Sequence, residues 1–220
     1  MALALFDLDN TLLAGDSDHL WGEFLAQRGL VDGAGFQQQN DAFYQDYVNG
    51  TLDIHAYLRF VLAPLVGRDP AELERWHADF MTNFIEPIIL PAAIELVEKH
   101  RQQGDTLVII TATNRFITAP IARRFGIDHL LASEGEQQDG RYTGEVAGIP
   151  CFQAGKVANL NLWLQDHPHD LHSATFYSDS HNDLPLLSLV GKPVAVDADA
   201  RLAAHARANG WPLLSLREPA

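Results

Sequence analysis

Cysteine is nearly absent from this sequence of 220 residues, which contains only Cys151. A single cysteine excludes a disulfide within the chain and any metal site built from several thiolates. Proteins without disulfides are typical of reducing compartments. We therefore expect Cys151 to be a structural residue that is at least partly buried, and we expect the protein to be cytoplasmic.

Basic residues and long apolar runs are also scarce. The 15 lysines and arginines stand against 29 aspartates and glutamates, which gives a formal net charge of −14. Such a chain is a poor electrostatic match for nucleic acid or for an anionic membrane. The nearest approach to a bilayer-spanning run, residues 85–96, is interrupted by Glu86 and Pro87, and a span needs about 18 apolar residues. The apolar N-terminus ends at Asp7 without a basic lead-in, unlike a signal peptide.

What the sequence does contain is an alternation of strand and helix patterns. Short apolar runs that stop at a polar residue predict buried parallel strands at residues 3–6, 106–110, 174–177 and 193–196. Helical patterns lie between them at residues 92–103, 117–125 and 156–165. The order predicts an α/β fold with a doubly wound, Rossmann-like parallel sheet. Ligands of such sheets bind outside the carboxyl ends of the strands.

The region after the first strand has a different pattern. Aromatic residues and leucines recur at helical spacing from about residue 16 to residue 84, and no strand pattern interrupts them. We expect residues 16–85 to form a helical cap inserted into a core made of residues 1–15 and 86–220. An Asp-Gly turn within residues 137–148 predicts a small hairpin.

Two acidic motifs follow predicted strands. Asp7 and Asp9 come directly after the first strand, where one carboxylate can attack phosphorus while the other transfers protons; an Asx-rich turn is the structural alternative. Asp179 and Asp183 follow another strand, with helix capping by Asp179 or Asn182 as the alternative. Parallel strands can bring Asp7 beside Asp179, and such crowded carboxylates favour a bound Mg²⁺.

Two further residues have a chemistry that suits phosphate. Lys156 opens a predicted helix, where the helix dipole disfavours a cation, so its ammonium group can be explained by a salt bridge or by a role in neutralising phosphate. Thr111 is expected to end the central strand, where its hydroxyl and the following amides can bind phosphate oxygens.

In this order the motifs resemble the haloacid dehalogenase (HAD) superfamily of aspartate-nucleophile phosphohydrolases. The resemblance covers essentially the whole chain and is most specific at residues 6–12 and 177–185. The helical insertion and the hairpin at residues 140–145 resemble the phosphoserine-phosphatase-like branch, subfamily IB. One departure is that Ser178 and Ser180 flank Asp179, where the commoner form of the motif has glycines.

The resemblance implies a role for each motif residue. Asp7 would form an aspartyl-phosphate, and Asp9 would protonate the leaving alkoxide and then activate water. Mg²⁺ would be held by the Asp7 carboxylate, the Asp9 backbone carbonyl and Asp179, with Asp183 supporting Lys156 or a metal-bound water. The groups that would hold the phosphoryl group are Thr111, Lys156 and Asn182.

Two residues bear on the substrate. Asp16 stands where phosphoserine phosphatases have an acid that meets the substrate ammonium, and Arg59 is the counterpart of their lid arginine, which meets the substrate carboxylate. Asp16 has an alternative as a helix N-cap, and Arg59 as a surface residue. If Asp16 binds the substrate ammonium but Arg59 does not reach the substrate, an amino-alcohol phosphate such as histidinol phosphate fits better than phosphoserine.

The sequence therefore predicts a Mg²⁺-dependent phosphatase for a small phosphorylated metabolite, without nucleic-acid or membrane partners and with no sign of its oligomeric state. A phosphotransferase or phosphomutase of the same superfamily is the alternative within enzymes. A non-catalytic module that binds a phosphorylated metabolite is the alternative outside enzymes.

Overall fold

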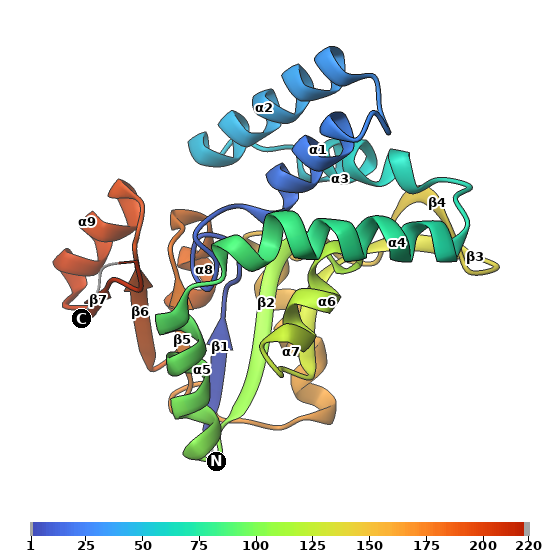
Figure 1. Cartoon of the computed structure of the whole chain (residues 1–220). Coiled ribbons are helices and arrows are strands. Elements are labelled where there is room, and N and C mark those ends of the chain that lie inside the picture. Colours follow the sequence, from blue (N-terminus) through green and yellow to red (C-terminus); the bar gives the residue numbers. More distant parts are fainter. Residues whose placement is uncertain (1, 218–220) are drawn as a thin grey trace.

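One sheet of seven strands runs through the protein in the order β4-β3-β2-β1-β5-β6-β7 (Figure 1). The structure is a computed structural model that describes residues 2–217, so residues 1 and 218–220 of the predicted core lie outside the described residues. All neighbouring strands are parallel except β3 and β4. The strands are β1 Leu3–Phe6, β2 Thr106–Asn114, β3 His129–Gln138, β4 Arg141–Ala147, β5 Thr175–Ser178, β6 Lys192–Val196 and β7 Leu213–Leu214. The predicted α/β fold is confirmed.

Helices connect these strands and cover both faces of the sheet. The α-helices are α1 Ser17–Gln27, α2 Gly33–Asn49, α3 Ile54–Leu62, α4 Pro70–Phe80, α5 Pro91–Gln102, α6 Arg115–Arg124, α7 Ala154–Asp166, α8 Leu184–Leu187 and α9 Ala200–Asn209. Short helical turns are η1 Ala63–Leu65, η2 Met81–Ile85, η3 Glu86–Ile88 and η4 His181–Asp183, of which η2 is a π-helix. No helix within residues 2–217 has the length and apolar content needed to cross a bilayer.

The central strand β1 supplies side chains to two separate hydrophobic clusters. Because successive side chains of a strand point to opposite faces, Ala4 and Phe6 join one cluster with α5 and α6, while Leu3 and Leu5 join the other with α7, α8 and α9. All four residues of β1 are buried. This burial on both faces explains why the strand is a continuous apolar run rather than an alternating one.

Helices α1 to α4 lie over the carboxyl ends of the strands, whereas α5 packs along one face of the sheet (Figure 1). In Figure 1, α1, α2 and α3 lie above the sheet and α4 runs beneath them. Their predicted aromatic core is present, since the ring of Trp21 lies 5.0 Å from that of Phe24 and 5.1 Å from that of Phe80. These rings belong to the same cluster as Phe6, so the helical segment is packed onto one face of the sheet.

Strand β2 differs from its prediction. It continues to Asn114 instead of ending before Thr111, and its register with β3 shifts between Ile110 and Asn114.

Strand β3 was not predicted, because its first half is an apolar parallel partner of β2 and its second half is a polar antiparallel partner of β4. The predicted turn between β3 and β4 is confirmed, with positive φ angles of 51° at Asp139 and 76° at Gly140.

Cys151 is fully buried and forms no disulfide. Burial raises the pKa of its thiol to about 12, so the thiol stays protonated near neutral pH. A protonated, inaccessible thiol is a poor nucleophile, which agrees with a structural role.

The two-faced burial of β1 predicts a strong effect of truncating one of its side chains. Leu5 is 0 % exposed, so Leu5→Ala leaves a cavity and is expected to lower the free energy of unfolding by about 2–5 kcal/mol. Leu162→Ala on α7 is the matched control, since Leu162 is 53 % exposed. Urea denaturation of both variants checks this, and an equal loss in the two would contradict it.

Candidate active site

The two acidic motifs meet at one edge of the sheet because β1 and β5 are parallel neighbours. Phe6 pairs with Tyr177, and the Asp7 amide donates to the Tyr177 carbonyl oxygen over 2.9 Å. The chain therefore leaves both strands at the same level, with Asp7 and Asp179 side by side as the sequence predicted.

A threonine that the sequence reasoning missed links these two aspartates. The Thr11 hydroxyl lies 3.4 Å from Oδ2 of Asp7 and 3.2 Å from Oδ1 of Asp179. The Asp179 amide in turn donates to the Thr11 hydroxyl over 3.1 Å. Thr11 is fully buried, so it fixes the distance between the two loops.

Lys156 forms the ionic centre of the site. Its Nζ donates to Oδ1 of Asp7 and to Oδ2 of Asp183, each over 2.7 Å, and all three side chains are buried. Burial lowers the pKa of Lys156, but the charges of Asp183 and Asp7 outweigh that effect and hold the pKa above its ordinary value. The ammonium group therefore stays charged. Ser178 also donates to Asp183, over 2.7 Å.

A glycine lets Lys156 approach the strand ends. Gly155 is the second residue of α7, and a Cβ atom there would lie 1.9 Å from the Pro150 carbonyl oxygen. Any larger residue would push the start of α7 away from this loop. The unfavourable position of Lys156 near a helix N-terminus is compensated by its two carboxylate partners.

Asp9 is held by a different set of donors. Its Oδ1 accepts from the Ser17 amide over 2.7 Å, and its Oδ2 accepts from the Thr113 hydroxyl over 2.8 Å. The hydroxyl of Thr111, the predicted phosphate-binding threonine, lies farther from Asp9 Oδ2, at 3.5 Å. Burial and the charge of Asp16 raise the pKa of Asp9 to about 6, against the opposing effect of its hydrogen bonds. A carboxyl group with this pKa can both give and take a proton near neutral pH.

The oxygen atoms around Asp7 and Asp179 suit a hard divalent cation. Burial raises the pKa of Asp7 to about 7, against the effect of Lys156. Burial and the charge of Asp7 also raise the pKa of Asp179 well above its ordinary range, and a cation between them would relieve this repulsion. Within residues 2–217, no three His, Cys, Asp or Glu side chains converge on one metal position. Backbone oxygen and water must complete such a site, as is usual for Mg²⁺.

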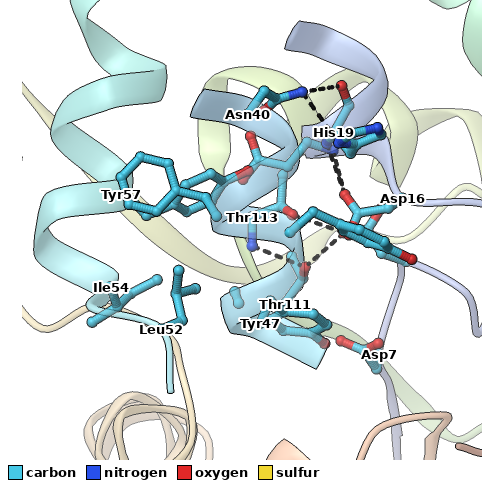
Figure 2. Close-up of a pocket in the computed structure, with 15 residues that line it drawn as sticks. Asp7, Asp16, His19, Asn40, Tyr47, Leu52, Ile54, Tyr57, Thr111 and Thr113 are labelled. Atoms are coloured by element: carbon cyan, nitrogen blue, oxygen red, sulfur yellow. Dashed lines mark hydrogen bonds between the residues drawn. The ribbon is translucent and has the colours of Figure 1, made fainter. Parts of the chain in front are cut away.

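A narrow cavity lies between these residues and the helical segment (Figure 2). Its walls include four carboxylates, Asp7, Asp9, Asp16 and Asp18, and four aromatic rings, Phe43, Tyr44, Tyr47 and Tyr57. Neither lysine nor arginine is found among the described residues that line it. A water-sized sphere has only about 40 Å³ of space there, enough for a few water molecules. A metabolite therefore cannot enter unless the helices above move.

The remaining predicted residues are placed differently. Asp16 caps α1, with Oδ1 accepting from the amides of Asp18 and His19 over 3.0 and 2.9 Å, and it also lines the cavity. Asn182 accepts from Gln153 and donates to the Tyr47 carbonyl, and it is outside the cavity lining. Arg59 is exposed on α3 and is not among the lining residues.

Comparison with known proteins identifies the family. The family model described as haloacid dehalogenase-like hydrolase matches residues 4–188. The chain belongs to this family. It is 47% identical to a histidinol-phosphatase of Neisseria meningitidis, over 98% of the chain and 99% of the relative. It is 36% identical to a phosphoserine phosphatase of Mycobacterium tuberculosis, over 98% of the chain and 71% of the relative.

Solved structures of HAD proteins have the same fold. A protein of unknown function from Bordetella pertussis superimposes with a TM-score of 0.91 at 43% identity, covering 98% of both chains. A substrate-bound phosphoserine phosphatase superimposes with a TM-score of 0.72 at 18% identity, covering 98% of this chain and 93% of the other. The predicted resemblance to the phosphoserine-phosphatase-like HAD proteins is confirmed.

The ionic centre makes a testable prediction about stability. Lys156→Met removes the ammonium group and leaves two buried carboxylates unpaired, so the free energy of unfolding at pH 7 is expected to fall by about 3–5 kcal/mol. Lys192→Met at the exposed start of β6 is the control, with an expected change within about 0.5 kcal/mol. Urea denaturation in metal-free buffer measures both. Unchanged stability of Lys156→Met would refute the assigned charges.

Proposed function

We propose that the protein is a Mg²⁺-dependent phosphatase that hydrolyses a small amino-alcohol phosphate through an aspartyl-phosphate on Asp7. The observation that carries the proposal is the pairing of two differently held carboxylates. Asp7 contacts a buried ammonium group, while Asp9 has a pKa near 6 and no cationic partner among the described residues. One is suited to attack and the other to proton transfer.

The chemistry follows from these positions. An Asp7 oxygen attacks phosphorus and forms the P–O bond of the aspartyl-phosphate, while the bond to the substrate alkoxide breaks. Asp9 gives its proton to that alkoxide. In the second step Asp9 takes a proton from water as the water attacks phosphorus, which releases inorganic phosphate and regenerates Asp7. Lys156 balances charge on Asp7 throughout, and this positioning is the main protein contribution to phosphoryl transfer.

The metal would be held by the Asp7 carboxylate, the backbone carbonyl of Asp9 and the Asp179 carboxylate. Phosphatases of this family generally depend on Mg²⁺, and the oxygen-only donor set supports the same ion here. When bound, Mg²⁺ supplies positive charge to the phosphoryl oxygens. Thr111 and Lys156 remain the proposed phosphate-binding side chains. Asn182 is a weaker candidate because its amide is already engaged with Gln153 and Tyr47.

We further propose that residues 16–85 act as a cap over a core of residues 1–15 and 86–220. The cavity has walls from both parts, with Asp7 and Thr111 on one side and Phe43 and Tyr57 on the other. Closure of the cap would exclude water from the aspartyl-phosphate and limit the size of the substrate. Phosphoproteins are therefore expected to be poor substrates.

The lining of the cavity supports an amino-alcohol phosphate over phosphoserine. Asp16 offers a carboxylate for a substrate ammonium, whereas a substrate carboxylate would meet acids and no lysine or arginine. A buried carboxylate without a partner is strongly disfavoured. Histidinol phosphate has the ammonium and lacks the carboxylate, and the Neisseria relative has the name histidinol-phosphatase.

The nucleophile is tested by Asp7→Asn. This isosteric change is expected to lower kcat for p-nitrophenyl phosphate by at least about a thousandfold, because the amide does not form the acyl phosphate. Circular dichroism should be unchanged, and Asp32→Asn at an exposed helix start should keep full activity. Chelation by EDTA should abolish hydrolysis and added Mg²⁺ should restore it. Full activity of Asp7→Asn would refute the mechanism.

The substrate class is tested by a panel of phosphomonoesters with Mg²⁺ present. We expect kcat/KM for histidinol phosphate to exceed that for phosphoserine by at least about tenfold, since an unpaired buried charge costs more than 1.4 kcal/mol. Release of inorganic phosphate is the measurement. A preference for phosphoserine would show that a cation outside the described lining reaches the substrate carboxylate.

A further inference from the structure

One carboxylate of the cavity is not accounted for by the mechanism. Asp18 on α1 is 3 % exposed and lines the cavity, and its Oδ1 is buried with no hydrogen-bond partner among the described residues. A buried acceptor left unpaired costs about 1–3 kcal/mol. Folded proteins satisfy nearly all such groups, and an exception within a ligand cavity indicates an atom that is paired when the ligand is bound.

Asp18 lies beyond Asp16 along the wall of the cavity. The charge of Asp7 contributes to the raised pKa of Asp16, whereas the raised pKa of Asp18 comes from burial and from the charges of Asp16 and Asp9. The hydroxyl groups of Tyr57 and Thr113 both lie next to the Asp18 carboxyl group, and Thr113 also donates to Asp9 over 2.8 Å. Figure 2 shows Tyr57 across the drawn cavity from Asp7. Asp18 therefore lies between Tyr57 and the proposed proton-transfer group Asp9, on the side of the cavity that the alcohol part of the substrate would occupy.

The cavity walls around Asp18 and Tyr57 suit a flat ring. The ring of Tyr57 meets that of Phe43 edge to face with centroids 5.2 Å apart, and Leu52 and Ile54 line the cavity as well. Aromatic and aliphatic walls favour an apolar, planar group. The free oxygen of Asp18 can accept a hydrogen bond from a donor on that group, and the acids around it disfavour an anion at this place.

We propose that Asp18 is a specificity residue that accepts a hydrogen bond from a ring N–H of the substrate. The substrate class is then an amino-alcohol phosphate with a nitrogen-containing heteroaromatic ring, such as imidazole, at the end opposite to the phosphate. This inference rests on the proposed phosphatase function and refines it. Asp16 takes the ammonium group, and Asp18 takes the ring.

The first arm of the test uses the wild-type enzyme with Mg²⁺. Histidinol phosphate is compared with its analogue in which thiophene replaces imidazole, because the two have five-membered rings and differ in the N–H donors. We expect kcat/KM to be at least about tenfold higher for the imidazole compound, since the analogue leaves Asp18 unpaired. Equal values for the two substrates would overturn the inference, whatever the variants do.

The second arm uses Asp18→Leu, which removes both carboxyl oxygens and keeps the branch at Cγ, and Asp18→Asn, which is nearly isosteric and keeps one acceptor oxygen. The preference for imidazole over thiophene is expected to fall to within about twofold in Asp18→Leu and to an intermediate value in Asp18→Asn. Thermal melting confirms that each variant is folded. Asp32→Asn, which exchanges an exposed aspartate outside the cavity, is expected to keep the wild-type preference and rate.

The outcomes separate this inference from the proposed function. If the folded Asp18→Leu variant keeps the wild-type preference while p-nitrophenyl phosphate is still hydrolysed, the inference fails and the phosphatase assignment stands. If the wild-type enzyme hydrolyses neither p-nitrophenyl phosphate nor histidinol phosphate with Mg²⁺, the proposed function fails and the inference fails with it.

Discussion

The buried ion pair between Lys156 and the carboxylates of Asp7 and Asp183 is the constraint on which the rest of the site depends. It joins residues that are 149 and 27 positions apart along the chain, each at 2.7 Å. A buried ammonium group is tolerated here because two carboxylates pair with it and offset its loss of hydration. The α7 start, the end of β1 and the turn after β5 must therefore keep one relative position, and Gly155 provides the close approach that this needs.

Different environments give the four cavity carboxylates different chemistry. Asp7 faces an ammonium group, Asp9 accepts two hydrogen bonds, and Asp16 is occupied with two backbone amides. Asp18 has one oxygen to which no group within residues 2–217 is hydrogen-bonded. In water these groups would titrate alike. Burial and neighbouring groups make these carboxylates differ, which suits one to the proposed role of nucleophile, one to that of acid and base, and two to the proposed substrate contacts.

The sequence predicted the strands and the acids at their ends because buried parallel strands are continuous apolar runs, and their polar endings are visible as breaks. It did not predict β3, whose apolar and polar halves have different partners. Thr11, Thr113 and Asp18 were missed for a related reason. Spacing along the chain shows which residues lie on the same face of one helix or strand. It does not show the contact of Thr113 with Asp9, 104 residues away, because that contact arises only when β2 continues past Ile110. A resemblance among motifs identified the charged residues, whereas their hydrogen-bond partners depend on tertiary packing.

A net charge of −14 would be expected to repel an anionic phosphate. This expectation neglects the distance between the surface charges and the site. Surface charges are screened within about 10 Å at 0.1 M salt, whereas a buried pair is screened far less. Lys156 contacts Asp7 over 2.7 Å, behind the described cavity lining, so a phosphoryl group bound at Asp7 would lie close to this buried ammonium group and to the proposed Mg²⁺, and the acidic surface would not prevent its binding. The acidic lining and its lack of lysine and arginine among the described residues favour a substrate with one anionic group. Under the proposed function, phosphomonoesters would therefore be distinguished by the cationic groups that they carry, and the acidic walls would make that selection.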